Sequence, residues 1–243
     1  MKTSPLLLMP TKKPRRTFDR ILDVSLAMFN RFGEHNVSTS QLCGELGISP
    51  GNLFYHHPTK NALVHGLLAR YQLALADVLA NAPPPHPWPE ASPALQALAA
   101  LCEGMAHVAW SYRFLFRDLP DLVSRHRQLE AQVPPLLQQQ AAALSHSMYQ
   151  LDWQAPAPSE LTLQLWVGPM LATLTGCMGL DGAMDPRERL RAHEDPVCDR
   201  AVGRALGMIL HALPRLDQAA LSKRLTETPE LGQDPWWLAS PQG

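Results

Sequence analysis

The stretch STSQLCGELGISPGNLFYHHPTK, residues 38–60, constrains the fold of this 243-residue chain more than any other. Ser38 stands three residues before Gln41, which is the spacing of a capping box at the start of a helix. Gly47 supplies the left-handed backbone that a tight turn between two helices requires. Ser49 followed by Pro50 is an N-cap followed by a first-turn proline, so a second short helix begins there. Two short helices that meet around a glycine predict a helix-turn-helix.

Helical periodicity continues on both sides of this motif. Apolar residues recur at helical spacing over residues 17–32 and from residue 60 to about residue 80. The segment NAPPPHPWPE then breaks the helix, because five of its ten residues are proline. Further helices are predicted at about 92–110, 126–150, 159–179 and 196–213, with two short helical pieces divided at Pro120. Pro134 and Pro135 either kink the helix over 126–150 or mark its true start. With no convincing strand or repeat, the sequence predicts an all-α fold.

Charge and cysteine content narrow the class of protein. Residues 1–70 contain nine Lys and Arg against four Asp and Glu, whereas the remainder contains twelve against eighteen. A basic end on an acidic body suits a polyanion-binding head, although a chance fluctuation would look the same. The four cysteines are widely spaced without a CxxC pair, which is typical of reduced thiols in a cytoplasmic protein. The uncharged stretch 161–180 contains Gln, glycines and a proline, so it fits a buried helix better than a membrane span.

The short helix after Gly47 carries polar and aromatic groups that no core requires. Recognition helices contact DNA bases from their N-terminal residues, and Asn52 is placed there to bond a base edge, most naturally adenine. Tyr55, His56 and Lys60 are suited to clamp phosphates. A plain helical hairpin would share the turn glycine, so the polar face is what favours DNA binding. The residues that build the turn are Cys43, Gly47, Ile48 and Leu53.

The segment TFDRILDVSLAMFNRFGEHNVSTSQLCGELGISPGNLFYHHPTKNALV, residues 17–64, resembles the N-terminal domain of TetR-family transcriptional regulators. The resemblance implies DNA contacts near the start of the second helix and on and beside the recognition helix. Carried over by position, these contacts are Thr39, Ser40, Pro50, Gly51, Asn52, Phe54, Tyr55, His56 and Lys60. Two positions depart from the family pattern. Phe54 lacks the phosphate-directed hydroxyl of the usual tyrosine, and His57 replaces an apolar residue and is expected to loosen packing there.

The resemblance also implies a domain organisation and a function. The expected parts are a flexible basic arm (1–16), a three-helix helix-turn-helix domain (17–64), a larger helical effector-binding and dimerisation domain (65–215) and a C-terminal tail (216–243). The implied protein is a homodimeric, sequence-specific DNA-binding transcriptional regulator, most often a repressor. It would bind an operator in double-stranded DNA and respond to a small apolar or amphipathic effector, coupled through the helix that begins at Lys60. No membrane, cofactor or metal ion is expected.

Two further features concern an effector pocket, which gains weight from the resemblance, and dimerisation. Met105, Trp110, Phe114, Trp166 and Met170 are candidates to line an effector pocket, although the same residues would suit an ordinary helical core. Small residues on the last two long helices permit close helix approach, as in the four-helix bundle of a homodimer, although they also suit an internal core. These small residues are Gly168, Ala172, Thr173, Gly176, Gly203 and Gly207.

Other functions are less well supported. A metal site at His56 and His57 is disfavoured because adjacent helical residues point about 100° apart and no carboxylate or cysteine follows at the next turn. Ser145, His146 and Asp152 lack the glycine-flanked elbow of a hydrolase nucleophile. An effector-independent DNA-binding or nucleoid-associated protein remains an alternative because it would share the same head. An enzyme is the least supported reading.

Overall fold

The computed structural model describes residues 17–81, 88–117, 119–184 and 194–227, and within these ranges it leaves out the side chains of 177–184 and 194–196. Every regular element in the described ranges is a helix, which confirms the predicted all-α fold there. The elements are α1 (Thr17–Phe32), α2 (Thr39–Leu46), α3 (Pro50–His56), α4 (Lys60–Ala80), α5 (Pro93–Ser111), α6 (Arg113–Arg117), α7 (Leu119–Arg125), α8 (Arg127–Tyr149), α9 (Glu160–Met184), α10 (Glu194–Gly207), the short 3-10 helix η2 (Leu210–Ala212) and α11 (Arg215–Glu227).

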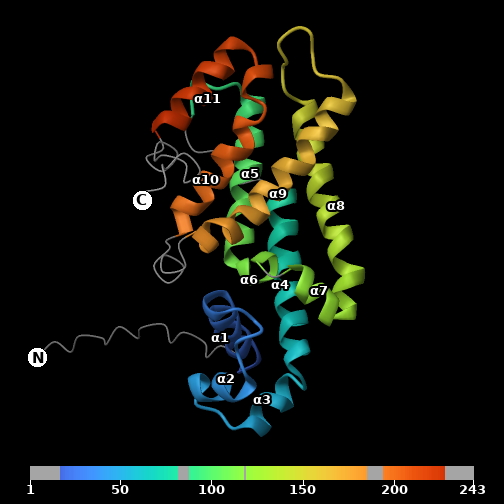
Figure 1. Cartoon of the computed structure of the whole chain (residues 1–243), viewed down its shortest axis with the longest axis vertical. Helices are drawn as coiled ribbons and strands as arrows, with labels where there is room; N and C mark the ends of the chain where they lie inside the picture. The colour runs from blue at the N-terminus through green and yellow to red at the C-terminus, as the bar shows by residue number, and fades with distance from the viewer. Residues whose placement is uncertain (1–16, 82–87, 118, 185–193, 228–243) are drawn as a thin grey trace, which may run out of the picture.

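The first three helices form a small unit at one end of the molecule, and α4 runs from this unit into the rest (Figure 1). We call α1–α3 the head and α5–α11 the body. The head closes around Ile21, Phe29, Leu42 and Leu53, none of which is more than 1% exposed. α4 packs against α1 near its start and against α5 and α8 farther along. A single helix therefore belongs to both parts.

The body is organised around α5, which contacts α4, α8, α9 and α10. Ala99, Ala106 and Ala109 on α5 are almost fully buried. Their short side chains let the neighbouring helices approach closely. α10 packs against both α5 and α9 within the same chain, and Gly203 on α10 is buried there.

α8 matches its predicted bounds to within one residue at each end, whereas α9 and α10 depart from theirs. α8 continues through Pro134 and Pro135, so the prolines neither begin nor end it. α9 extends to Met184, beyond the predicted end near residue 179. α10 begins at Glu194 and ends at Gly207, earlier than predicted, and η2 follows it. Residues 185–193, between α9 and α10, lie outside the described residues.

The chain after residue 215 begins with a helix where a tail was expected. Asp217 of α11 is 2% exposed, and its carboxylate accepts hydrogen bonds from the backbone N–H and the hydroxyl of Ser92 at 2.7 Å each. Arg224 pairs with Glu103 of α5. These partners lie more than 100 residues apart, so the helical tail could not be anticipated from local sequence. Residues 228–243 lie outside the described ranges.

α4 is the described helix that is long and apolar enough to cross a membrane by composition alone. Leu63, Leu67 and Tyr71 on this helix are nevertheless buried against the head and the body. The apolar face of α4 therefore serves the core of the protein.

Candidate nucleic-acid interface

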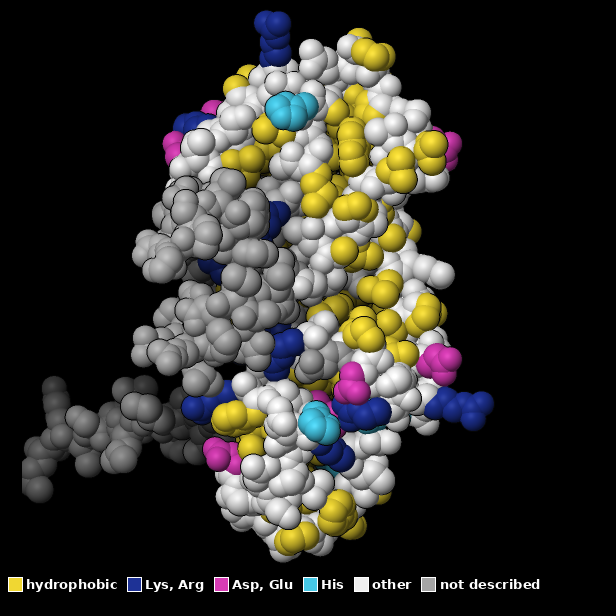
Figure 2. All heavy atoms as spheres, viewed as in Figure 1, with side chains coloured by type: hydrophobic (Ala, Val, Ile, Leu, Met, Phe, Trp, Pro, Cys, Tyr) yellow, Lys and Arg dark blue, Asp and Glu magenta, His cyan; other side chains and the backbone are white. Residues whose placement is uncertain are grey.

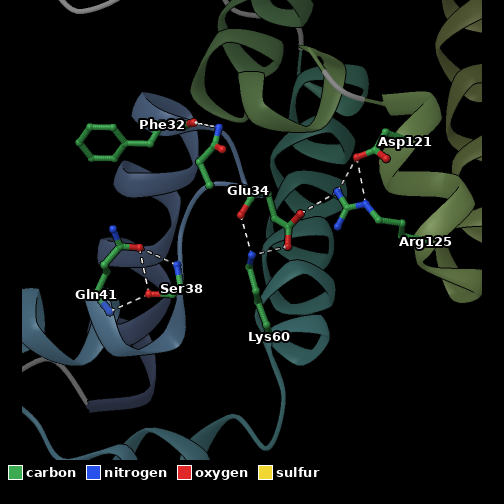
Figure 3. A network of polar contacts seen from close by, with 8 residues as sticks. Phe32, Glu34, Ser38, Gln41, Lys60, Asp121 and Arg125 are labelled. Carbon is green, nitrogen blue, oxygen red and sulfur yellow. Dashed lines mark hydrogen bonds and ion pairs between the residues drawn. The ribbon is translucent and has the colours of Figure 1, made fainter.

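The start of α2 and the turn between α2 and α3 are both fixed by hydrogen bonds between residues close in sequence. The Ser38 hydroxyl accepts from the backbone N–H of Gln41 at 3.2 Å, and the Gln41 side chain accepts from the backbone N–H of Ser38 at 2.8 Å (Figure 3). Gly47 ends α2 with a φ of 65°, a left-handed conformation that favours glycine. The N–H of Ile48 then donates to the carbonyl of Cys43 at 3.1 Å. The capping box and the turn glycine are both as predicted.

α3 is held by one buried side chain and exposes its outer face. The hydroxyl of Ser49 accepts from the backbone N–H of Asn52 at 3.2 Å and caps the helix. Leu53 is 1% exposed and anchors α3 to the head, whereas Tyr55 is 84% exposed. α2 and α3 lie at the end of the molecule opposite α11 (Figure 1). Of the nine predicted DNA contacts, Ser40, Pro50, Gly51, Asn52, Phe54 and Tyr55 are exposed, and Thr39, His56 and Lys60 are half-buried.

The two positions that depart from the family pattern have different surroundings. Phe54 lies exposed on α3. His57 is 3% exposed, and its ring stacks on Phe18 with 4.4 Å between ring centroids. Burial lowers the pKa of His57, and the positive charges of His56 and Arg70 lower it further, against the effect of the Phe18 carbonyl. His57 was expected to loosen the packing. It is instead a neutral ring packed at the C-terminal end of α3.

Lys60 begins α4 beside the recognition helix, and its ammonium group is held by Glu34 (Figure 3). Nζ of Lys60 donates to the backbone carbonyl of Glu34 at 2.6 Å and pairs with one carboxylate oxygen at 3.0 Å. The other carboxylate oxygen pairs with Arg125 of α7 at 2.8 Å, and Arg125 also pairs with Asp121 at 2.6 Å. The network joins the loop between α1 and α2, the start of α4 and the end of α7. A predicted phosphate contact is thus already engaged within the protein.

Glu34 stays charged although it is buried. Burial disfavours a carboxylate and by itself raises its pKa. The hydrogen bonds and positive charges of Lys60 and Arg125 outweigh burial and hold the pKa of Glu34 below its ordinary value. At neutral pH the site therefore contains a buried anion between two cations from different helices.

A second set of contacts joins α1 to α6. The Asn30 side chain donates to the carbonyl of Ser111 at 2.8 Å and accepts from the backbone N–H of Phe114 at 3.1 Å. The Phe29 and Phe114 rings lie 5.4 Å apart, and the Phe29 carbonyl accepts from Arg117 at 3.2 Å. We call these contacts, together with the ion pair of Glu34 to α7, the junction. They attach the head to residues 111–125 of the body independently of α4.

The other face of the same α6–α7 segment borders an apolar crevice between α4, α6, α7 and α8. Its volume is about 20 Å³, which is room for one water molecule. Gln140 is 1% exposed in its wall and donates to the carbonyl of Leu136 at 3.2 Å. The lining residues are Leu68, Tyr71, Leu115, Phe116, Leu119, Val133, Leu136, Leu137 and Gln140.

The side chains predicted to line an effector pocket lie elsewhere. Met105, Trp110, Phe114 and Met170 are at most 9% exposed and belong to the hydrophobic core. Trp166 on α9 is half-buried. None of the five lines the crevice, and Phe114 packs on the head. Their effector-binding role stays a prediction.

Two family models match this chain. Residues 21–67 match a model described as bacterial regulatory proteins of the TetR family, and residues 70–156 match a model of the TetR bacterial transcriptional repressor. Together the matches span more than half of the chain.

Individual relatives match over a part of the chain. The HTH-type transcriptional regulator UidR of Escherichia coli K12 is 35% identical over 60 residues, which are 25% of this chain and 30% of UidR. The nucleoid occlusion factor SlmA of Haemophilus ducreyi is 28% identical over 78 residues, which are 32% of this chain and 39% of SlmA. The matched stretches thus span well under half of these relatives.

Solved structures share the fold over most of the chain. A TetR-family regulator from Marinobacter aquaeolei VT8 superposes with a TM-score of 0.71 at 24% identity, over 87% of this chain and 98% of the other. A γ-butyrolactone receptor superposes with a TM-score of 0.57 at 17% identity, over 87% and 97% of the two chains. The helical arrangement of this chain therefore recurs in both solved structures.

Proposed function

Because the chain belongs to the TetR family of bacterial regulatory proteins, we propose that it is a sequence-specific DNA-binding transcriptional regulator, a repressor released by a small-molecule effector. One observation carries the DNA-binding role: α3 exposes its polar outer face, and Leu53 is its one buried residue. A helix of this kind fits the major groove with its N-terminal residues toward the bases. The proposed location is the cytoplasm.

The nine candidate contacts divide into three roles. Asn52, in the first turn of α3, reads a base edge, and Pro50 and Gly51 beside it are small enough to let the backbone approach the groove. Tyr55 and His56 on α3 and Lys60 at the start of α4 bind phosphates. The remaining contacts position the head on the DNA, and they are Thr39, Ser40 and Phe54.

Binding assays with operator variants separate these roles. Asn52→Ala should weaken binding by about 1–3 kcal/mol and relax the preference at one base position. Tyr55→Phe should weaken binding to all sequences alike, because a phosphate contact carries no base information. Leu73→Ala, at an exposed position of α4, is the control. Unaltered base preference in Asn52→Ala rejects the base-reading role, and wild-type protein without salt-dependent binding to DNA around its own gene rejects the function.

A second copy of the chain is the proposed occupant of the exposed face of α9. Leu161 and Leu165 are 65% and 63% exposed one helical turn apart, and hydrophobic side chains gather along the α8–α9 side of the body (Figure 2). Apart from the adjacent residues and the backbone of α9 itself, no described atom lies within 4 Å of where a side chain would begin at Gly168 or Gly176. Small residues on an exposed apolar helix allow close packing against a symmetry-related helix. Gly203, another of the small residues predicted to allow close helix packing, is buried within the chain and does not belong to this face.

Leu165→Glu tests this assignment. The charged side chain should convert the dimer to a monomer in analytical ultracentrifugation, and operator affinity should fall because two half-sites are no longer read together. Leu216→Glu makes the same change at an exposed leucine of α11 and should leave a dimer. A dimeric Leu165→Glu variant would assign the interface elsewhere.

A small apolar or amphipathic effector is proposed to bind by enlarging the crevice. One wall is the part of α8 that contains Pro134 and Pro135, where two backbone N–H donors are missing and bending is easiest. Tyr71 and Gln140 are the lining residues that carry polar groups. Leu136→Trp should fill the crevice and abolish release of DNA by a compound that releases the wild type. Unchanged release would place the effector site elsewhere.

A nucleoid-associated role is the second candidate, and it is supported by the similarity to SlmA, described as a nucleoid occlusion factor. Such a protein would share the head and lack an effector response. Mapping of occupied sites in cells distinguishes the two: a few sites near transcription units favour the repressor, and many dispersed sites that no small molecule releases favour the alternative.

A further inference from the structure

Lys60 is predicted to contact a DNA phosphate, yet in this structure its ammonium group is bound by the buried residue Glu34. Nζ of Lys60 has two partners on Glu34, at 2.6 and 3.0 Å, and the Lys60 side chain is only 25% exposed. A DNA phosphate and this buried carboxylate would attract the same ammonium group. Glu34 therefore competes with DNA for Lys60.

Arg125 binds the same carboxylate and therefore affects how readily Lys60 can leave Glu34. While Arg125 bonds one oxygen at 2.8 Å, Glu34 keeps a cationic partner even if Lys60 turns away. If α7 withdraws Arg125, the departure of Lys60 would leave a buried charge unpaired, which is strongly unfavourable. Lys60 is then held more firmly.

α7 is placed to receive a signal from the body. Leu119 at its start lines the crevice, as do Leu115 and Phe116 of the preceding α6. Arg125 ends the same short helix. A change in the crevice that shifts α7 therefore reaches the Glu34 carboxylate without passing through α4.

We propose that Glu34 is a positioning residue that restrains Lys60 from DNA, and that Arg125 makes the restraint depend on the position of α7. The proposal rests on the proposed DNA-binding function. It differs from a purely structural role for Glu34 in the sign of its consequence. A structural role predicts that loss of the carboxylate weakens DNA binding, whereas restraint predicts that it strengthens binding through Lys60.

DNA affinity measured against salt concentration tests the sign. Glu34→Gln should steepen the log–log salt dependence of non-specific binding by about one and tighten binding roughly tenfold at 0.1 M salt, as for one added phosphate contact. Lys60→Met in the same background should remove this gain. Asp23→Asn is the matched control, because it removes the same charge and an ion pair between α1 and Arg70 of α4 without touching Lys60. Its slope should match the wild type.

Amine acetylation of the DNA-free protein, read by mass spectrometry, tests the restraint without DNA. Lys60 should react several-fold faster in Glu34→Gln and more slowly in Arg125→Met than in the wild type. Arg127→Met removes the same charge at an exposed position two residues away and should leave the rate unchanged. Lys223, far along the chain on α11, serves as the internal reference.

The outcomes are distinct. Weaker binding by Glu34→Gln, a gain that survives Lys60→Met, or equal acetylation rates in Glu34→Gln and the wild type would each overturn the proposal. If Glu34→Gln does not fold, the wild-type and Arg125→Met rates decide alone, and equal rates overturn it. A wild type that binds no DNA but shows the predicted acetylation rates would reject the proposed function and leave the restraint of Lys60 standing.

Discussion

The head and the junction that attaches it to the body depend on contacts of different range. In the head, Ser38 and Ser49 each cap their own helix by accepting from a backbone N–H three residues ahead, and Thr59 caps the following α4 in the same way. In the junction, Asn30 and Glu34 bond to partners 81 to 91 residues away. The turn of the head can thus form from local sequence, whereas the junction exists only when head and body are docked. We expect substitutions in the two regions to differ in both size and kind.

Leu53→Ala should give the largest loss, because it removes the buried anchor of α3. Leu53 is 1% exposed, and truncation of such a leucine costs about 2–5 kcal/mol of unfolding free energy. Denaturant unfolding measures the loss. Leu73→Ala, at a 73% exposed leucine of α4, should stay within about 0.5 kcal/mol of the wild type. A loss below about 1 kcal/mol for Leu53→Ala would mean that α3 is held by contacts other than its anchor.

Asn30→Ala should give an intermediate loss from the junction. It leaves the Phe114 N–H and the Ser111 carbonyl without their side-chain partner, and an unsatisfied buried group costs about 1–3 kcal/mol. Asn36→Ala removes the same side chain from a local, exposed bond to the Phe32 carbonyl and should cost less than about 1 kcal/mol. The comparison is made by thermal unfolding of both variants. Equal losses would show that contact range does not distinguish the two regions.

The same difference in range explains what the sequence could predict. The capping box at Ser38, the turn at Gly47 and the anchor Leu53 depend on residues within a few positions of each other, and the structure contains them. Glu34 and Arg125 were not singled out, because an acidic residue after a helix and an arginine at the end of another carry no local sign that they meet. Their pairing depends on how α7 docks, which periodicity does not encode.

The crevice and the C-terminal helix show the same limit. Aromatic and methionine content drew attention to Met105 and Met170, which pack in the core. The crevice is lined mainly by aliphatic side chains of α4, α6 and α8, a composition shared with any helical core. α11 is fixed by Asp217 bonding to Ser92. Neither feature has a sequence signature separable from ordinary packing.

Two buried histidines, one in each region, give the smallest effect, because both are neutral in the folded protein at neutral pH. Burial is the main cause that lowers the pKa of His57, and it is also the main cause for His126. Arg125, His65 and Lys60 lower the pKa of His126 further, while Glu34 opposes them. Among the described atoms, neither ring nitrogen of His126 has a hydrogen-bond partner.

The sign of the pH dependence follows from these shifts. When the folded pKa lies below the unfolded value of about 6.5, the unfolded chain binds more protons between the two values. The unfolding free energy should therefore fall as the pH falls through about 6.5 and level off below the folded pKa. Glu34, whose pKa is lowered from 4.5, loses its contribution only at more acidic pH, so the two windows are separable.

Unfolding of His57→Gln and His126→Gln at a series of pH values between 7 and 5 assigns this slope to the two regions. Each substitution should flatten the slope, and the double variant should flatten it most, with His146→Gln on the exposed side of α8 as the control. Hydrogen exchange then distinguishes the regions, because a proton on His126 has Glu34 and Asp121 as nearby anions, and both carboxylates already bond Arg125. Acid should therefore speed exchange at the junction in the wild type and not in His126→Gln. Faster exchange confined to α3, removed by His57→Gln, would instead make the locally built head the more acid-sensitive region.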